Sequence, residues 1–151
     1  MAQTLTSTLA RGMASGVGGT VVMTAFQKLV EMPLTGRSES YAPAKLVMRL
    51  LPVRPRTPEK RRRLNNVTHY AIGTGWGAAA ALAVRAGLRG QTAVAAVFVP
   101  LYVGDVILNT ALGLYKPADW SLEDWAVDVV DKLVQAEATG FLVERVGSGR
   151  S

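Results

Sequence analysis

The sequence predicts an all-α protein, a four-helix integral membrane bundle formed by a single domain over residues 1–151. The first observation is the segment 90–115, which carries one formal charge, Asp105, in an otherwise apolar stretch. A helix of about 20 apolar residues is long enough to cross the hydrocarbon core of a bilayer. The second observation is the composition, with 49% apolar residues and a mean hydropathy of +0.20. The third is that no segment alternates strictly between polar and apolar residues, as a half-buried strand would.

Four long helices are expected, and their ends follow from capping residues and prolines. The predicted ranges are residues 11–32, 66–85, 90–114 and 121–146. Pro33 is expected to end the first helix, and Asn65 and Asn66 are expected to cap the start of the second. Pro100 lies inside the third helix, where neighbouring helices in a membrane can satisfy the freed backbone groups. A capping box that begins at Ser121 starts the fourth helix.

A basic, Pro-rich connection, residues 33–65, joins the first two helices and contains a short helix near residues 44–51. Its densest charge cluster is the run Lys60, Arg61, Arg62 and Arg63, which we expect to contact anionic lipid headgroups of a bilayer. The run lacks interleaved aromatic side chains that would stack on bases, which argues against nucleic acid as a partner. Ten basic residues lie on the side of this connection and five on the opposite side. The positive-inside rule therefore predicts a cytoplasmic connection and both termini outside.

Each predicted helix contributes polar side chains at a similar depth. The last three helices are treated as antiparallel neighbours with turns near residues 88 and 118, which brings Asp105 level with His69 on one side and with Asp131 and Lys132 on the other. The full predicted layer comprises Gln27, His69, Asp105, Asn109, Asp128, Asp131 and Lys132. An isolated buried charge is costly, so we expect Asp105 to pair with Lys132 and His69 to be hydrogen-bonded nearby.

Two interpretations of this polar layer stay open at the level of sequence. In the functional one, the layer handles protons or cations, or forms a polar pocket for a ligand. In the structural one, it consists of interhelical hydrogen bonds that hold the bundle together, each contributing roughly 1 kcal/mol or less. The sequence favours the structural interpretation, because no set of residues specifies a reaction.

Small residues at a spacing of four predict close packing between helices, because they let two backbones approach. The predicted packing positions are Gly12, Gly16, Gly73, Gly77 and Gly140. Two rows of small residues each follow a polar residue at the same spacing, one after His69 and one after Lys132. This similarity predicts an internal repeat of two helical hairpins arranged in parallel.

A histidine-glycine motif in the second predicted helix carries a family resemblance. It reads His69-Tyr70-x-x-Gly73-x-x-x-Gly77 and follows a Gly-rich first helix that ends Glu31-Met32-Pro33. Over about residues 12–145 the chain resembles the YagU-like group of small bacterial inner-membrane proteins. The resemblance implies a multi-pass fold in the inner (plasma) membrane and brings no established activity. The last helix of that group often carries a second histidine where this chain has Lys132, so the resemblance does not imply shared proton chemistry.

Composition and motifs restrict the chemistry available to the chain. It has no cysteine and one histidine, so disulfides and thiolate chemistry are excluded and neither a metal site nor a cofactor is expected. No nucleophile motif or phosphate-binding turn accompanies the histidine, so the sequence leans against an enzyme without excluding one.

Three functions fit these observations. The first is a small multi-pass membrane protein with a structural, accessory or scaffolding role, acting as a homo-oligomer or with a membrane-protein partner. The second is a small proton- or cation-linked transporter that uses the same polar layer. The third is a soluble helical-bundle binding protein whose fourth helix turns its charged stripe to water.

Overall fold

The computed structural model describes residues 4–148, and this part of the chain is entirely helical, with no strand. The all-α prediction is therefore confirmed. The helices are α1 (Leu5–Phe26), α2 (Met32–Thr35), α3 (Ala42–Leu50), α4 (Pro58–Arg85), α5 (Gly90–Ala111) and α6 (Leu122–Ser148). A π-helical turn, Gln27–Glu31, joins α1 to α2, and a 3-10 turn, Pro117–Asp119, precedes α6.

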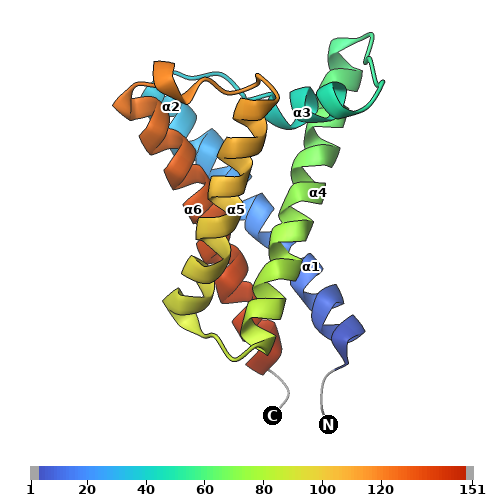
Figure 1. Ribbon diagram of the computed structural model, residues 1–151, viewed down its shortest axis with the longest axis vertical. Coiled ribbons are helices and arrows are strands. Elements are labelled where there is room, and N and C mark those ends of the chain that lie inside the picture. Colours follow the sequence, from blue (N-terminus) through green and yellow to red (C-terminus); the bar gives the residue numbers. More distant parts are fainter. Residues whose placement is uncertain (1–3, 149–151) are drawn as a thin grey trace.

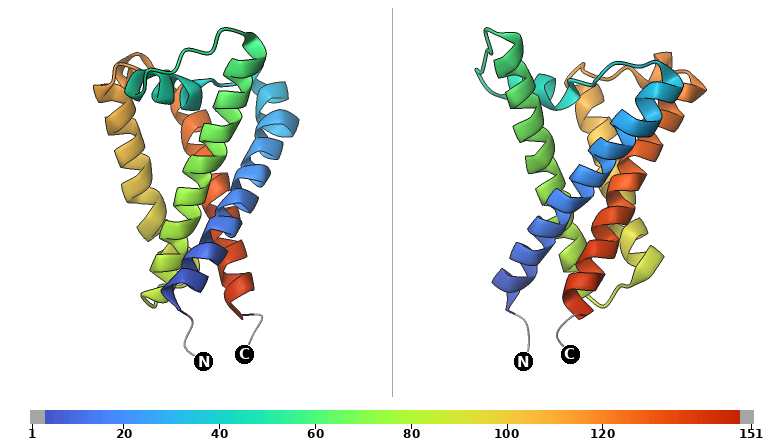
Figure 2. Two further views of the ribbon diagram at one scale, coloured as in Figure 1. Left: turned by 90° about the vertical axis from the view of Figure 1, so that its right-hand side faces the viewer. Right: turned by 180° about the vertical axis from the view of Figure 1, so that it is seen from behind.

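The four long helices run up and down in chain order along the long axis of the molecule (Figure 1). Helix α1 packs on α4 and α6, and α5 packs against α4 and α6. Helices α1 and α4 cross near the end that carries both termini and diverge toward the other end (Figure 2). The short helix α3 lies across that wider end, beside the turn that connects α5 to α6.

The first helical segment is longer at both ends than predicted. It begins at Leu5 because the Thr4 side chain caps it, accepting a hydrogen bond of 3.2 Å from the Ser7 N–H. Pro33 does not end it, contrary to the prediction. In a regular α-helix the Pro33 ring would clash with the carbonyl four residues earlier, and the wider π-helical turn directly before α2 relieves that clash. The helical course ends at Gly36, whose φ of +68° suits a glycine cap.

The predicted start of the second long helix at Asn65 and Asn66 is wrong. Helix α4 begins at Pro58, and the Thr57 side chain caps it by accepting from the Lys60 N–H at 3.2 Å. Asn65 is instead buried in the second turn of α4, where it caps a different helix. Its Oδ1 accepts from the Ala44 N–H in α3 at 3.1 Å, and its Nδ2 donates to the Ser40 carbonyl at 3.0 Å. Asn65 thereby joins α3 to α4.

The remaining predicted elements are close to those observed. The short helix expected near 44–51 is α3, and α5 begins at Gly90 as predicted and runs through Pro100. The capping box at the start of α6 is confirmed, because Ser121 Oγ accepts from the Asp124 N–H at 3.1 Å and the Asp124 carboxylate accepts from the Ser121 N–H at 2.7 Å. The connection 33–65 is correspondingly shorter, since α2 and α4 extend into it from both sides.

Glycines make the crossing of α1 and α4 possible. A Cβ added at Gly12 would lie 2.5 Å from the Gly77 carbonyl oxygen, and one at Gly16 would lie 2.9 Å from the Gly77 Cα. A Cβ at Gly73 would overlap the Thr20 side chain, so both rows of small residues face the other helix. Gly140 faces α5 instead, where its Cβ would meet Val94 at 2.7 Å. Gly77 of α4, which faces α1, and Gly140 of α6, which faces α5, occupy corresponding places in the predicted repeat of two hairpins. The repeat itself stays a prediction.

The distribution of polar and apolar side chains is inverted relative to a soluble bundle. The buried polar residues are Thr8, Ser15, Thr20, Asn65, Asn109, Asp131, Gln135 and Thr139. The buried apolar residues are mostly alanine, valine or the single Trp76, which packs with Val94 and Phe98. Large apolar side chains are instead exposed along the long helices. They include Met13, Val17, Val21 and Val22 on α1, Val99, Val103, Ile107 and Leu108 on α5, and Val130, Leu133 and Phe141 on α6.

One helix among the described residues, Gly90–Ala111, is long and apolar enough to cross a membrane by length and composition alone. The sequence-based prediction of four spans in the inner membrane is therefore not supported by this criterion. The other long helices miss it because they are rich in glycine, hydroxyl and amide side chains, or in the charged side chains of α6.

Replacing Gly77 with alanine tests the glycine crossing. The new methyl group would overlap the backbone of α1, so we expect Gly77→Ala to lower the free energy of unfolding by about 1–3 kcal/mol. Gly75→Ala is the matched control on the same helix, because its Cβ meets nothing within 4 Å. It should be neutral or stabilising, by up to about 1 kcal/mol. Unfolding of the purified protein, followed by circular dichroism, measures both; equal effects of the two variants would contradict the crossing.

Replacing Asn65 with alanine tests the cap that joins α3 to α4. Loss of both side-chain hydrogen bonds should cost about 1–2 kcal/mol and speed amide exchange at Ala44 and the rest of α3. Asn66→Ala is the matched control, since the exposed neighbour makes neither bond. Hydrogen-exchange mass spectrometry over residues 42–50 provides the measurement. Unchanged protection of α3 in Asn65→Ala would mean that the cap does not hold it.

Candidate functional site

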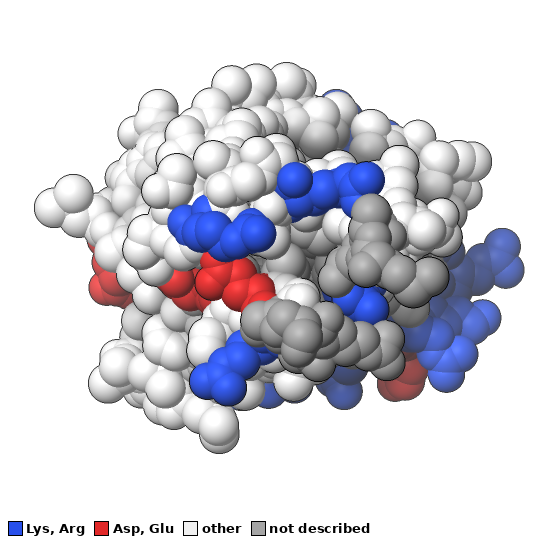
Figure 3. Space-filling model, turned by 90° about the horizontal axis from the view of Figure 1, so that it is seen from below, with Lys and Arg blue, Asp and Glu red and all other residues white. Residues whose placement is uncertain are grey.

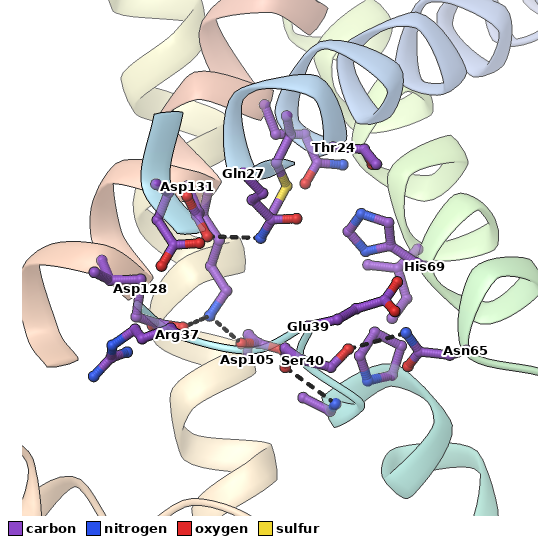
Figure 4. A pocket seen from close by; sticks show the side chains of 18 of the residues that line it. Thr24, Gln27, Arg37, Glu39, Ser40, Asn65, His69, Asp105, Asp128 and Asp131 are labelled. Carbon is purple, nitrogen blue, oxygen red and sulfur yellow. Dashed lines mark hydrogen bonds and ion pairs between the residues drawn. The ribbon is translucent and has the colours of Figure 1, made fainter. Parts of the chain in front are cut away.

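A cavity of about 510 Å³ lies where α1, α4, α5 and α6 diverge, at the end opposite the termini. Helix α3 and the segment 36–41 form part of its rim, through Ser40 and Lys45 among others. Figure 4 shows side chains from all four long helices pointing into this space. The cavity exists because the glycine crossing brings the helices together at one end, while their straight courses separate them at the other.

The seven residues of the predicted polar layer all line this one cavity. They are Gln27, His69, Asp105, Asn109, Asp128, Asp131 and Lys132. The structure therefore brings all seven together at one cavity, although the partners of some side chains differ from those expected.

Lys132 is the centre of the charged cluster. Its Nζ lies 2.8 Å from Asp105 Oδ2 on α5 and 2.7 Å from Asp128 Oδ1 on its own helix. The predicted pair of Asp105 and Lys132 is confirmed, with Asp128 as a second acceptor. The rings of Tyr102 and Tyr115 lie 5.1 and 5.4 Å from the ammonium group, within range for cation–π attraction. The ammonium is thus surrounded by two carboxylates and two aromatic rings.

Asn109 orients Asp105. Its Nδ2 donates to both the backbone carbonyl and Oδ1 of Asp105, each at 2.9 Å, one turn earlier on α5. Asn109 is 2% exposed, so its amide group is held within the bundle. This leaves Oδ2 of Asp105 directed to Lys132.

Asp131 does not join the Lys132 cluster as predicted. It faces α1, where its Oδ2 accepts from Gln27 Nε2 at 2.6 Å. Its other oxygen, Oδ1, is buried and has no hydrogen-bond partner in the described part of the chain. Asp131 as a whole is 6% exposed. A carboxylate oxygen at that burial is costly without a partner.

His69 projects from α4 into the cavity, on the side opposite Asp128 and Asp131 (Figure 4). Its ring lies edge-to-face with Tyr70, with centroids 6.1 Å apart. The prediction that His69 is hydrogen-bonded nearby is wrong, since no bond to it forms among residues 4–148. The helices diverge at this level, which places the imidazole across open space from the carboxylates.

Below the cavity, three helices meet at a buried polar junction. Gln135 Nε2 on α6 donates to Thr20 Oγ1 on α1 at 3.0 Å, and the Thr20 hydroxyl donates to the Gly16 carbonyl at 2.8 Å. Thr20 and Thr139 are 0% and 1% exposed. Gly73 leaves the room on α4 that these side chains fill. The junction closes the cavity toward the end that carries the termini.

An ion-paired rim closes part of the opposite side. Arg37, which follows the Gly36 cap, pairs with Asp124 and lies 3.5 Å from Glu123 Oε1, so the segment 36–41 is tied to the start of α6. The hydrogen bond with Asp124 raises the pKa of Arg37 above its usual value. Tyr115, in the turn before α6, is buried enough that the pKa of its hydroxyl rises to about 12, so it stays neutral beside Lys132.

The basic run Lys60–Arg63 does not line the cavity and does not lie in a loop. All four side chains are exposed in the first two turns of α4, which extend beyond α3 at the wide end (Figure 1). Arg61 lies over the Tyr41 ring at 5.0 Å. The cluster thus projects from the same end as the cavity opening.

Several lining residues were missed from sequence. Asn65, Ser40 and Glu39 lie in or beside the connection that was predicted to be a loop, so no helical register could align them with the layer. Gln135 follows Asp131 by one helical turn, and that spacing alone could have identified it.

Comparison of the sequence and the structure with known proteins found no matching family model, no similar curated protein and no similar solved structure. The resemblance to the YagU-like group stays a prediction.

Replacing Lys132 with methionine tests the charged cluster. The substitution leaves two largely buried carboxylates without a cation, and we expect the free energy of unfolding to fall by about 3–5 kcal/mol. Adding Asp105→Asn should recover part of the loss, because one unpaired charge is removed. Lys116→Met, at an exposed position, is the control and should change stability little. Thermal unfolding is compared for the wild type, Lys132→Met, Asp105→Asn, the double variant and the control Lys116→Met. Additive effects of the two cluster substitutions would show that Asp105 and Lys132 are not coupled.

Proposed function

We propose that this chain is a small multi-pass membrane protein whose polar interior is a solute-binding vestibule, as in a small cation-linked carrier. The observation that carries the proposal is the inverted distribution of side chains, with hydroxyl, amide and carboxylate groups inside and large apolar groups outside. In water such a surface would favour aggregation, whereas in lipid it is the expected one.

The burial of α5 supports a membrane setting. An apolar helix in a soluble protein is normally the buried core helix, yet only 17% of the most apolar part of α5 is buried. Val99, Val103 and Ile107, about one turn apart, form an exposed apolar stripe on it. A single helix of this kind is weak support by itself, and the matching apolar faces of α1 and α6 extend the argument to the bundle.

The long uncharged part of α4 supports the proposal that more than one helix crosses the membrane. Helix α4 carries no Asp, Glu, Lys or Arg from residue 64 to residue 84, and 21 residues of α-helix are roughly 31 Å long, close to the thickness of a hydrocarbon core. On α5 and α6 the charges at mid-height, Asp105, Asp128 and Lys132, turn inward to one another. Seen from the end with the termini, much of the outline is uncharged, with acidic side chains at the left edge and a mainly basic group on the right (Figure 3).

The basic end suggests an orientation. Lys60–Arg63, α3 and the cavity opening lie at one end, and both termini lie at the other. The positive-inside rule assigns the basic end to the cytoplasm, with both termini outside. Helix α3, lying across this end, then suits the headgroup region, and the exposed run Lys60–Arg63 suits contact with anionic lipid.

The cavity favours a carrier over a purely structural role. Polar groups that hold helices together need only one another, as Gln135 and Thr20 do. In the cavity, two carboxylate oxygens, Asp128 Oδ2 and Asp131 Oδ1, form no hydrogen bond within the described chain, and about 510 Å³ stays open beside them. The same fold is compatible with a structural, accessory or scaffolding role, and these roles remain predictions.

Single-cysteine labelling tests the vestibule, because the chain has no native cysteine to remove. Thr24 lines the cavity from α1, and Val21, one turn earlier, is half exposed on the outer surface. In membranes, a water-soluble maleimide should react with Thr24→Cys and not with Val21→Cys, and both should react after denaturation. The protein should also stay in the pellet after carbonate extraction. Faster labelling of Val21→Cys, together with release into carbonate, would establish the soluble binding protein instead.

A further inference from the structure

The charge of the cavity lining differs in sign from that of the whole protein. The chain carries a formal net charge of +6, but six acidic and four basic side chains line the cavity, a net charge of −2. Lys132 is the basic residue at its floor, and it is already bound by Asp105 and Asp128. The floor therefore retains negative charge that no protein cation neutralises.

Two carboxylate oxygens at this floor have no partner within the described chain. Asp128 and Asp131 lie three residues apart on α6 and so share a helix face. Oδ1 of Asp131 and Oδ2 of Asp128 are buried without a hydrogen bond in the described residues, and the Tyr102 hydroxyl lies near Asp128. Asp131 is more than nine-tenths buried, which makes an unsatisfied acceptor especially costly. A donor with positive charge would satisfy both the hydrogen-bonding and the electrostatic deficit.

The size and walls of the cavity restrict that donor. About 510 Å³ is in the range of pockets for small organic molecules and far exceeds what a bare ion needs. Within residues 4–148, no three Asp, Glu or His side chains are placed to hold a metal ion. The lining also includes the apolar side chains of Met23, Ile72 and Trp76. His69 projects into the cavity from the side opposite Asp128 and Asp131 (Figure 4). The lining thus combines carboxylates with apolar and aromatic side chains.

We propose that the vestibule binds a small organic cation, with its ammonium group against Asp128 and Asp131 and its apolar body against Ile72 and Trp76. This assignment rests on the proposed function, because the ligand must enter through the opening at the wide end. The ammonium donates hydrogen bonds to the unpaired carboxylate oxygens, and Trp76 offers a ring face to the body or to the cation. Lys132 stays bound between the two carboxylates and the two tyrosine rings. Its positive charge reduces the net negative charge of the cavity floor.

Three probes that share a body and differ in charge test the assignment. These are 2-phenylethylammonium, the neutral 2-phenylethanol and the anion phenylacetate, each titrated into the purified full chain in detergent. Trp76 and Trp120 line the cavity, so tryptophan fluorescence reports binding. We expect the ammonium probe to bind at least about tenfold more tightly than the alcohol, and the anion to bind weakest. Equal affinities of the wild-type protein for the three probes would by themselves overturn the proposal.

Matched variants locate the cation. Asp131→Asn keeps the shape of the side chain and an acceptor for Gln27. It should lower the affinity for the ammonium probe about tenfold or more and leave the affinity for the alcohol unchanged. Glu137→Gln is the control on the same helix, because Glu137 bonds Gln91 and does not line the cavity. It should leave both affinities unchanged. If Glu137→Gln weakens binding as much as Asp131→Asn, the cation is attracted by the general charge of α6 and the site is wrong.

Protection of the Thr24→Cys variant separates this inference from the proposed function. If Thr24→Cys reacts with the maleimide in membranes and the ammonium probe slows the reaction, both stand. If it reacts and no concentration of the probe slows it, the vestibule stands and the cationic ligand is wrong. If it does not react before denaturation, the vestibule itself is absent and the proposed function fails with it.

Discussion

The contact between α1 and α4 depends on the absence of side chains at four positions. Backbone atoms of the opposite glycine row occupy the places where Cβ atoms of Gly12, Gly16 and Gly77 would lie, and the Thr20 side chain occupies the place of a Cβ at Gly73. Two straight helices that touch near one end and cross at an angle must separate toward the other end. The remaining helices fill that separation only partly, so the same contact that makes the bundle tight at the end with the termini creates a cavity at the other.

The polar interior follows from this geometry. At the tight end the helices lie close enough for Gln135 on α6 to donate directly to Thr20 on α1, whose hydroxyl donates to the Gly16 carbonyl. At the wide end, longer side chains are needed to bridge the gap, and Lys132 is long enough to reach Asp105 on α5. Both solutions put polar groups inside. Many large apolar side chains, among them Val99, Val103 and Ile107 on α5, lie on the outside, and this distribution is the basis of the proposed membrane setting.

Much of the architecture could be predicted from local patterns, and each of the misses has an identifiable physical cause. The length of α5 and the capping box of α6 are signals within one segment, and both were correct. Pro33 failed as a helix end because a π-helical turn absorbs it, and such a turn has no strong sequence signature. Asn65 is a capping residue, as its type suggests, but the helix that it caps lies 21 residues earlier in the chain. Its partner is set by packing and not by sequence distance.

In the candidate site, too, local sequence patterns predicted some features, whereas the packing of the helices decided others. Helical rise and the positions of the turns place residues at a given depth, so the sequence by itself determined that Gln27, His69, Asp105 and Lys132 belong to one layer, and all of them line the cavity. Depth does not determine how far each helix is rotated or how wide the gap is at that depth. The tertiary structure alone decided that Lys132 bridges Asp105 and Asp128, that Asp131 turns to Gln27 and that His69 faces open space. The reason is that hydrogen bonds and ion pairs act over about 3 Å, while the crossing of α1 and α4 sets the spacing between helices from a point several turns away.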